Sequence, residues 1–253
     1  MARSTITARA VQAAHNNALW CDTICRAHGI PTEFQAHLWL SRQPVPRFYP
    51  NAVTFANLAA GNAQLAQMHQ LLAEALPSSA GVKDSFCTLE LAPLGFHQLF
   101  EATWLWRESR PLLDRAVVQA DWYRVRDADE LAKWEIAWNG PPAGEQSAPP
   151  ARVFPPALLA QPDIVFIAAA IGQRIVAGAI ANRTDDVVGL SNVFAPAGAA
   201  ARFWPGCVGA VMEAFAGLPL VGYERGDELA IALALGFEAV GPLRVWARTA
   251  ERG

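Results

Sequence analysis

The sequence predicts an α/β fold built on a mixed sheet (α+β), and three observations in its second half support this prediction. Three β-rich runs follow one another at close spacing, which indicates an antiparallel meander. A strand, a helix and another strand follow near the end of the chain, which indicates a parallel crossover. Helical periodicity appears before and after the meander, so we expect helices on both faces of the sheet.

The meander is predicted from two runs, 164–171 and 174–181, that flank the Gly-Gln pair 172–173. A glycine in the first position of a two-residue loop suits a type II′ turn, so these runs are expected to form a hairpin. The Asp-Asp pair 185–186 marks the next turn, and 187–195 is the third strand.

The segment before the meander predicts a strand over 122–125 and a helix over 127–138. Asp127 or Asp129 is the expected N-cap, because a carboxylate there accepts hydrogen bonds from free backbone N–H groups. The segment 140–150 is rich in proline and glycine, so it is predicted to be a long loop that can act as a lid. The apolar surface of the helix is expected to come from Leu131, Trp134, Ile136 and Trp138.

The segment after the meander predicts a helix over 205–216, with Pro205 in its first turn, where a missing N–H is tolerated. A strand over 218–223, a helix over 227–235 and a strand over 243–247 complete the pattern.

The composition excludes several classes of protein. Charged residues make up 17% and the formal net charge is −3, so a nucleic-acid-binding surface, which needs a basic excess, is not expected. The longest apolar stretch, 164–181, is interrupted by a turn, so no membrane span is expected. The N-terminal residues lack the pattern of a secretory signal, so we expect a cytoplasmic protein. The 53% of hydrophobic residues indicates an unusually apolar core or an interface, which a homodimer would provide.

The four cysteines are too few and too scattered for a disulfide framework. Cys21 and Cys25 can share one face of a helix, with His15 and His28 nearby, so a metal site has to be considered. Zinc sites usually repeat such a pair later in the chain, and no second pair follows. We therefore interpret these cysteines as small buried hydrophobic residues and expect no metal site.

The order of elements over residues 116–250 resembles that of the acyl-CoA N-acyltransferase (GNAT) superfamily. The clearest local match is the helix that runs into Leu-Gly-Phe at 235–237 and is followed by a strand at 243–246. The glycine ends the helix and the phenylalanine fills the core beside it. The first half repeats this string at 94–96, so we predict a degenerate GNAT-like half-domain over 1–110 and a complete domain over 111–253, with chance similarity as the alternative.

The resemblance implies that acetyl-CoA or another acyl-CoA binds between two parallel strands that splay apart, here 188–195 and 218–223. Backbone N–H groups in a glycine-containing loop before the next helix, here 196–206, would hold the pyrophosphate. The loop departs from the family pattern, because the glycine spacing differs and Pro205 lacks an N–H donor. The implied cofactor-binding residues are Val193, Phe194, Ala195, Arg202, Gly206 and Gly209.

The family chemistry also requires a base for the amine, an oxyanion donor and an acid for the thiolate. The usual tyrosine acid is replaced by Ala232 here, so Tyr223 is the candidate acid, with Glu224 or Asp227 as the base. The alternative is that 223–227 is a polar loop in which Asp227 caps the next helix.

Ser191 and Asn192 are the remaining polar pair in apolar surroundings, and they either orient a substrate or belong to a strand bulge. The resemblance thus predicts an enzyme that transfers an acyl group from acyl-CoA to a small amine. The alternatives are a non-catalytic GNAT-fold binding protein that has lost the pyrophosphate loop, and a structural subunit.

Overall fold

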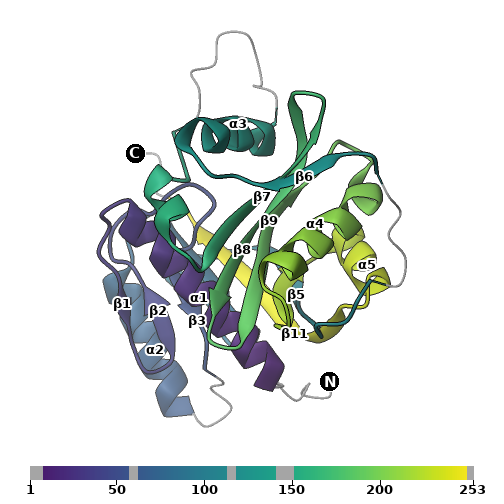
Figure 1. Cartoon of the computed structure of the whole chain (residues 1–253). Coiled ribbons are helices and arrows are strands. Elements are labelled where there is room, and N and C mark those ends of the chain that lie inside the picture. Colours follow the sequence, from purple (N-terminus) through teal and green to yellow (C-terminus); the bar gives the residue numbers. More distant parts are fainter. Residues whose placement is uncertain (1–7, 57–61, 113–117, 141–150, 250–253) are drawn as a thin grey trace. The chain divides into compact units, whose positions relative to one another are not determined.

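The computed structural model describes residues 8–56, 62–112, 118–140 and 151–249. It confirms the predicted mixed α/β architecture, with five α-helices and eleven strands in the described residues (Figure 1). Residues 141–150 of the predicted lid lie outside the described part. Among the described helices, none is both long enough and apolar enough to cross a bilayer.

The chain divides into two compact units. The first unit extends to Trp106 and also contains 223–225 and the chain from Ala239 onward. The second unit contains 107–222 and 226–238. The division therefore falls close to the expected boundary at residue 110, but the last strand of the chain groups with the first unit.

The second unit contains the predicted antiparallel meander, and its hairpin and turns are confirmed. The strand order is β10-β9-β8-β7-β6, with β6 at the edge of the described sheet and only β10 parallel to its neighbour β9. Gly172 adopts φ 62° in the hairpin turn, a conformation that glycine adopts without steric cost. The strands are β6 (Asp121–Arg124), β7 (Ile164–Ile171), β8 (Arg174–Thr184), β9 (Val187–Phe194) and β10 (Leu220–Glu224).

Helix α3 (Ala128–Asn139) begins as predicted, because the Asp127 carboxylate accepts hydrogen bonds from two backbone N–H groups of the first turn. Trp134 is fully buried, whereas Ile136 is 69% exposed, so Ile136 supplies apolar surface on the side of the helix that faces away from the core. Two residues correspond to about 200° of helix rotation, which places Ile136 almost opposite Trp134.

Helix α4 (Ala200–Ala214) begins five residues earlier than predicted, and Pro205 lies inside it. The prediction placed Pro205 in the first turn, whereas it occupies the sixth helical position. A proline there removes the hydrogen bond to the carbonyl of Ala201. Ala201 is exposed, so water can satisfy that carbonyl.

The two helices cover opposite faces of the meander, as predicted. Trp134 of α3 packs edge-on against Phe166 and Phe194 and donates a hydrogen bond of 2.8 Å to the Ile167 carbonyl. Phe203 of α4 packs with Ala169, on the other face, because alternate residues of a strand point to opposite sides. The remaining helix of this unit is α5 (Gly226–Ala234).

The first unit has the strand order β1-β2-β3-β4-β11-β5. In the first unit, β3, α2 and β4 follow one another in the chain, and β3 pairs with β4 in parallel. In the second unit, β9, α4 and β10 have the same order and the same parallel pairing. This shared order is what a repeat requires, and the repeat itself stays a prediction. The elements are α1 (Ala8–Ala27), β1 (Glu33–Phe34), β2 (Leu38–Leu40), β3 (Ala52–Thr54), α2 (Asn62–Ala75), β4 (Ala80–Asp84), β5 (His97–Arg107) and β11 (Glu238–Arg248).

Candidate functional site

The candidate site of the second unit begins where strands β9 and β10 stop pairing. Their parallel register covers Leu220 with Val188 and Val221 with Gly189, and among the described residues it extends no further, although β9 continues to Phe194. A Cβ on the next residue of β10, Gly222, would lie 2.8 Å from the Leu190 carbonyl oxygen. The two backbones therefore still approach closely one residue beyond the last paired position, and β9 after Leu190 is left without its parallel partner.

A bulge interrupts β9 directly after this point. Gly178 of β8 is paired with Phe194 and Ile180 with Ser191, so β9 contains one extra residue. Asn192 adopts φ 52°, a left-handed conformation that asparagine tolerates better than most residues. The bulge interpretation of Ser191 and Asn192 is confirmed, and their role in orienting a substrate stays a prediction.

The Ser191 hydroxyl oxygen is buried and has no hydrogen-bond partner in the described part of the chain. An unsatisfied buried hydroxyl costs about 1–3 kcal/mol, so such groups usually meet a water or a ligand. A water or a polar ligand group at the bulge would therefore gain a hydrogen bond with the Ser191 hydroxyl.

The N-terminus of α4 follows β9 after a short loop and presents free backbone donors. Its N-cap residue, Ala199, makes no side-chain cap hydrogen bond, and no acidic residue lies in the first turn. Gly198 precedes it with φ 72°. Arg202 is exposed in the first turn. A helix N-terminus with free N–H groups and a nearby arginine favours an anion.

Gly206 and Gly209 were predicted to help hold the pyrophosphate, which requires free N–H groups near the start of the helix. Both residues lie further inside α4 than predicted, because the helix begins at Ala200 rather than at Pro205. A Cβ on Gly206 would lie 2.1 Å from the Trp122 ring, so this glycine allows a strand of the sheet to pack closely against the helix. The loop that precedes the helix consists of residues 195–199, which sequence reasoning assigned only in part.

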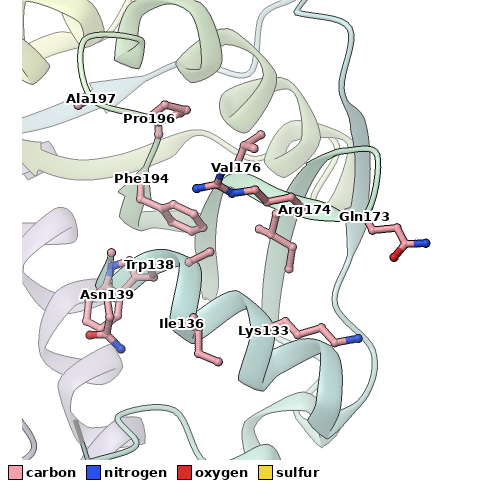
Figure 2. A pocket seen from close by; sticks show the side chains of 14 residues that line it. Lys133, Ile136, Trp138, Asn139, Gln173, Arg174, Val176, Phe194, Pro196 and Ala197 are labelled. Atoms are coloured by element: carbon pink, nitrogen blue, oxygen red, sulfur yellow. The ribbon is translucent and has the colours of Figure 1, made fainter. Parts of the chain in front are cut away.

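A pocket of about 760 Å³ opens beside the end of β9 within the second unit (Figure 2). Three segments form it: the end of α3, the start of β8, and the end of β9 with the following loop. Phe194 and Ala195 were predicted as site residues and both line it. Its lining comprises Lys133, Ile136, Ala137, Trp138, Asn139, Gly140, Gln173, Arg174, Ile175, Val176, Phe194, Ala195, Pro196 and Ala197.

Sequence reasoning missed Lys133 and Arg174, the two cations of the pocket lining. Arg174 directly follows the predicted hairpin turn and begins β8. Because β8 and β9 are antiparallel, the start of β8 lies beside the end of β9, so the predicted pairing could have placed Arg174 near the site. Lys133 lies on the polar side of α3, where a solvent-facing lysine is ordinary and gives no signal.

Tyr223 lies in the first unit, where it contacts a buried lysine that sequence reasoning also missed. The Lys83 ammonium nitrogen lies 4.6 Å from the centroid of the Tyr223 ring and donates a hydrogen bond of 2.9 Å to Asn17 Oδ1. Trp104 packs edge-on against the other side of the tyrosine, with 5.4 Å between ring centroids. Burial lowers the pKa of Lys83, but the neighbouring Tyr223 and Cys21 outweigh it and hold that pKa above its usual value.

The two candidate bases belong to different elements and different units. Glu224 follows Tyr223 in β10 and belongs to the first unit, whereas Asp227 lies exposed in the first turn of α5 in the second unit. The predicted alternative, that Asp227 caps this helix, does not hold, because α5 already begins at Gly226. An acidic residue in a first turn is nevertheless stabilised by the helix dipole. Ala232 is fully buried on α5. Across the described residues, no group of three or more His, Cys, Asp or Glu side chains could hold a metal ion.

Comparison with known proteins identifies the architecture. Neither a protein-family model nor a curated protein matches the sequence. Among solved structures, a GCN5-related N-acetyltransferase from Kribbella flavida has a TM-score of 0.62 at 17% identity and covers 95% of this chain and 96% of its own length. A GNAT-family protein from Novosphingobium aromaticivorans has a TM-score of 0.51 at 14% identity, with coverages of 92% and 97%.

The chain has the GNAT fold. The resemblance predicted from the order of elements is therefore confirmed at the level of the fold, and sequence identity this low supports nothing finer. A protein described as functionally unknown, from Staphylococcus epidermidis, shares the fold at a TM-score of 0.54 and 11% identity, with coverages of 87% and 94%. Because one fold hosts many functions, the function depends on the residues of the site and not on the fold.

Proposed function

We propose that the protein transfers an acyl group from acetyl-CoA or another acyl-CoA to a small amine. The observation that carries the proposal is the early end of the pairing between β9 and β10, after Val221 and Gly189, followed by the uncapped N-terminus of α4. The unpaired part of β9 offers backbone groups to an extended amide-containing chain such as pantetheine. The free N–H groups of α4, with Arg202, suit a pyrophosphate.

Acyl-CoA supplies an activated thioester, and the described residues fit such a group. The amine nitrogen attacks the thioester carbonyl carbon, the C–N bond forms and the C–S bond breaks. The ammonium form of the acceptor would give one proton to the base before the attack, and the nitrogen would lose a second proton as the amide forms. The departing thiolate would take up one proton and leave as the thiol. We assign oxyanion stabilisation to backbone N–H groups at Val193 and Phe194, and the orienting role to Ser191 and Asn192.

For proton transfer we assign Tyr223 as the acid for the thiolate and Glu224 or Asp227 as the base for the amine. Ala232 occupies the place at which the resemblance implies a tyrosine, so another hydroxyl is required if the acid step is catalysed. Replacing Tyr223 with phenylalanine is then expected to lower kcat by about 10²- to 10⁴-fold while the affinity for acetyl-CoA stays unchanged. Unchanged turnover would remove Tyr223 from the mechanism.

Thermal unfolding in the presence of CoA or acetyl-CoA tests the binding step. A ligand at 100 times its Kd adds about 2.7 kcal/mol to the free energy of unfolding, which raises Tm by roughly 5–10 °C for a chain of this length. The informative variant is Ala201→Glu, because an acid in the first turn stabilises the helix but repels a phosphate. Ala214→Glu, at the other end of α4, is the matched control.

We expect Ala201→Glu to abolish the shift with CoA and Ala214→Glu to retain it. No shift with either ligand in the unmodified protein would contradict the proposal and favour the non-catalytic binding protein. A shift without acyl transfer to any amine would favour the same alternative, with acyl-CoA as its ligand.

A further inference from the structure

The pocket of the second unit has a charge pattern that neither the fold nor the proposed binding of CoA requires. Among its 14 lining residues are two cations, Lys133 and Arg174, and no aspartate or glutamate. Figure 2 shows the Arg174 guanidinium turned toward the side where Phe194 and Pro196 lie, whereas the Lys133 ammonium points away from them. The arginine is therefore the cation that faces the interior of the pocket.

Arg174 has no carboxylate partner in the described part of the chain. Five other arginines there do pair with a carboxylate, at nitrogen–oxygen distances of 2.6–3.6 Å, and one of them, Arg183, lies on the same strand as Arg174. The pairs are Arg26–Asp22, Arg42–Glu33, Arg152–Glu135, Arg183–Asp163 and Arg244–Glu101. The planar guanidinium of Arg174 remains available to bind a carboxylate with two parallel hydrogen bonds.

The rest of the lining is mostly apolar and partly exposed, and its uncharged polar side chains are those of Asn139 and Gln173. Ile136 exposes 69% of its side chain although it lies on a well-packed helix, and Trp138 and Phe194 contribute aromatic surface. A volume of about 760 Å³ is within the range of small-molecule sites. Such a pocket suits a compact molecule with an apolar or aromatic body and one anionic group.

The pocket also adjoins the strand along which the thioester is proposed to lie. Phe194, the last residue of β9, and Ala195, which follows it, both line the pocket within the same unit. We propose that this pocket binds the acyl acceptor, and that the acceptor is an amine bearing a carboxylate and an apolar or aromatic body, with the carboxylate held by Arg174. This inference rests on the proposed acyl transfer, and it names the acceptor class.

Calorimetric titration without any CoA tests the acceptor class separately from acyl transfer. The probes are L-phenylalanine and L-phenylalaninamide, which share the amine and the ring and differ in the carboxylate. We expect the unmodified protein to bind phenylalanine at least about tenfold more tightly than the amide, as one charge-assisted contact provides. Arg174→Met should remove this preference, and Arg174→Lys should retain part of it because the charge stays but the planar fork is lost.

Arg126→Met is the matched control, because it removes one exposed positive charge of the same unit outside the pocket lining. It should keep the preference for phenylalanine. Substitution at the exposed Arg174 is not expected to unfold the protein, which thermal unfolding verifies.

Several outcomes would overturn the inference. They are the absence of binding by phenylalanine, equal binding of the acid and the amide, or a preference that persists in Arg174→Met. A loss of CoA affinity in Arg174→Met, with the preference for phenylalanine unchanged, would assign the arginine to a phosphate of CoA and also overturn it. Binding of phenylalanine without turnover would instead contradict the proposed acyl transfer and leave the anion-selective pocket established.

Discussion

The first unit contains a buried cation, Lys83, and the second unit contains an exposed cation, Arg174, and the surroundings of the two side chains differ. Lys83 is 7% exposed, and its ammonium group is enclosed by the Asn17 amide oxygen and the Tyr223 ring. Arg174 lies beside exposed apolar side chains and has no carboxylate partner among the described residues. A cation that is satisfied inside the chain belongs to the structure, whereas an unpaired cation in an apolar pocket points to a ligand.

The largest effect is expected from removing the acceptor of the buried ammonium group. Asn17→Leu leaves the Lys83 charge without its hydrogen bond, which should lower the free energy of unfolding by about 3 kcal/mol. Lys83→Met removes the charge itself and should cost about 1 kcal/mol, because an apolar side chain of similar length can fill the site. Urea unfolding of both variants and of the double variant measures the difference.

The double variant should be more stable than Asn17→Leu alone. If Asn17→Leu lowers the free energy of unfolding no more than Lys83→Met does, the Asn17 amide does not stabilise the ammonium group. Lys83 would then not be a cation satisfied within the chain, and its contrast with Arg174 would be lost.

A smaller effect is expected at alkaline pH, from a thiol next to the same cluster. Burial raises the pKa of Cys21 from 9.0 to about 11, with Lys83 opposing the shift. The folded thiol keeps its proton where the unfolded thiol loses it, so this contribution to stability is complete below pH 9 and is lost as pH rises through 11. Two pKa units correspond to a loss of about 2.7 kcal/mol.

Cys21→Ala should make the alkaline decline in stability shallower. Urea unfolding at one pH below 9 and one near 11 measures the slope for both proteins. Equal slopes would mean that the thiol is solvated in the folded state.

The smallest effect on stability is expected in the pocket. Ile136→Thr replaces a side chain that is 69% exposed, so the free energy of unfolding should change by no more than about 0.5 kcal/mol. The affinity for L-phenylalanine should nevertheless fall several-fold, because the exposed apolar surface is then lost to the ligand. A large loss of stability would show that Ile136 stabilises the folded protein by packing. The pocket would then resemble the buried surroundings of Lys83 and not a ligand site.

The strands of the second unit could be predicted because their signals are local. The hairpin at Gly172 follows from one turn and two β-rich runs, and the start of α3 follows from the Asp127 cap. The bulge at Asn192 was one of two interpretations, because a polar pair in an apolar strand indicates either a bulge or a ligand contact. The homodimer and the N-terminal half-copy stay predictions.

The remaining features depend on tertiary contacts. The start of α4 was misplaced because a proline usually marks a first turn, whereas here an exposed carbonyl tolerates the lost hydrogen bond at Pro205. The partnership of Lys83 with Tyr223 joins residues from β4 and β10, and no local pattern connects them. Ile136 was predicted only as apolar surface of α3, and its angular position opposite Trp134 explains why that surface is exposed.

The close packing of Gly206 against Trp122 has a consequence for solubility. Trp122 belongs to β6, which covers the open side of β7, and all but the last residue of β7 are buried. Any side chain at position 206 would push the tryptophan away from the helix and loosen the edge strand. The apolar run Ile164–Ile171 would then become an exposed sheet edge that can pair with other molecules. We therefore expect Gly206→Ala, which adds a single methyl group to the helix, to increase aggregation during expression.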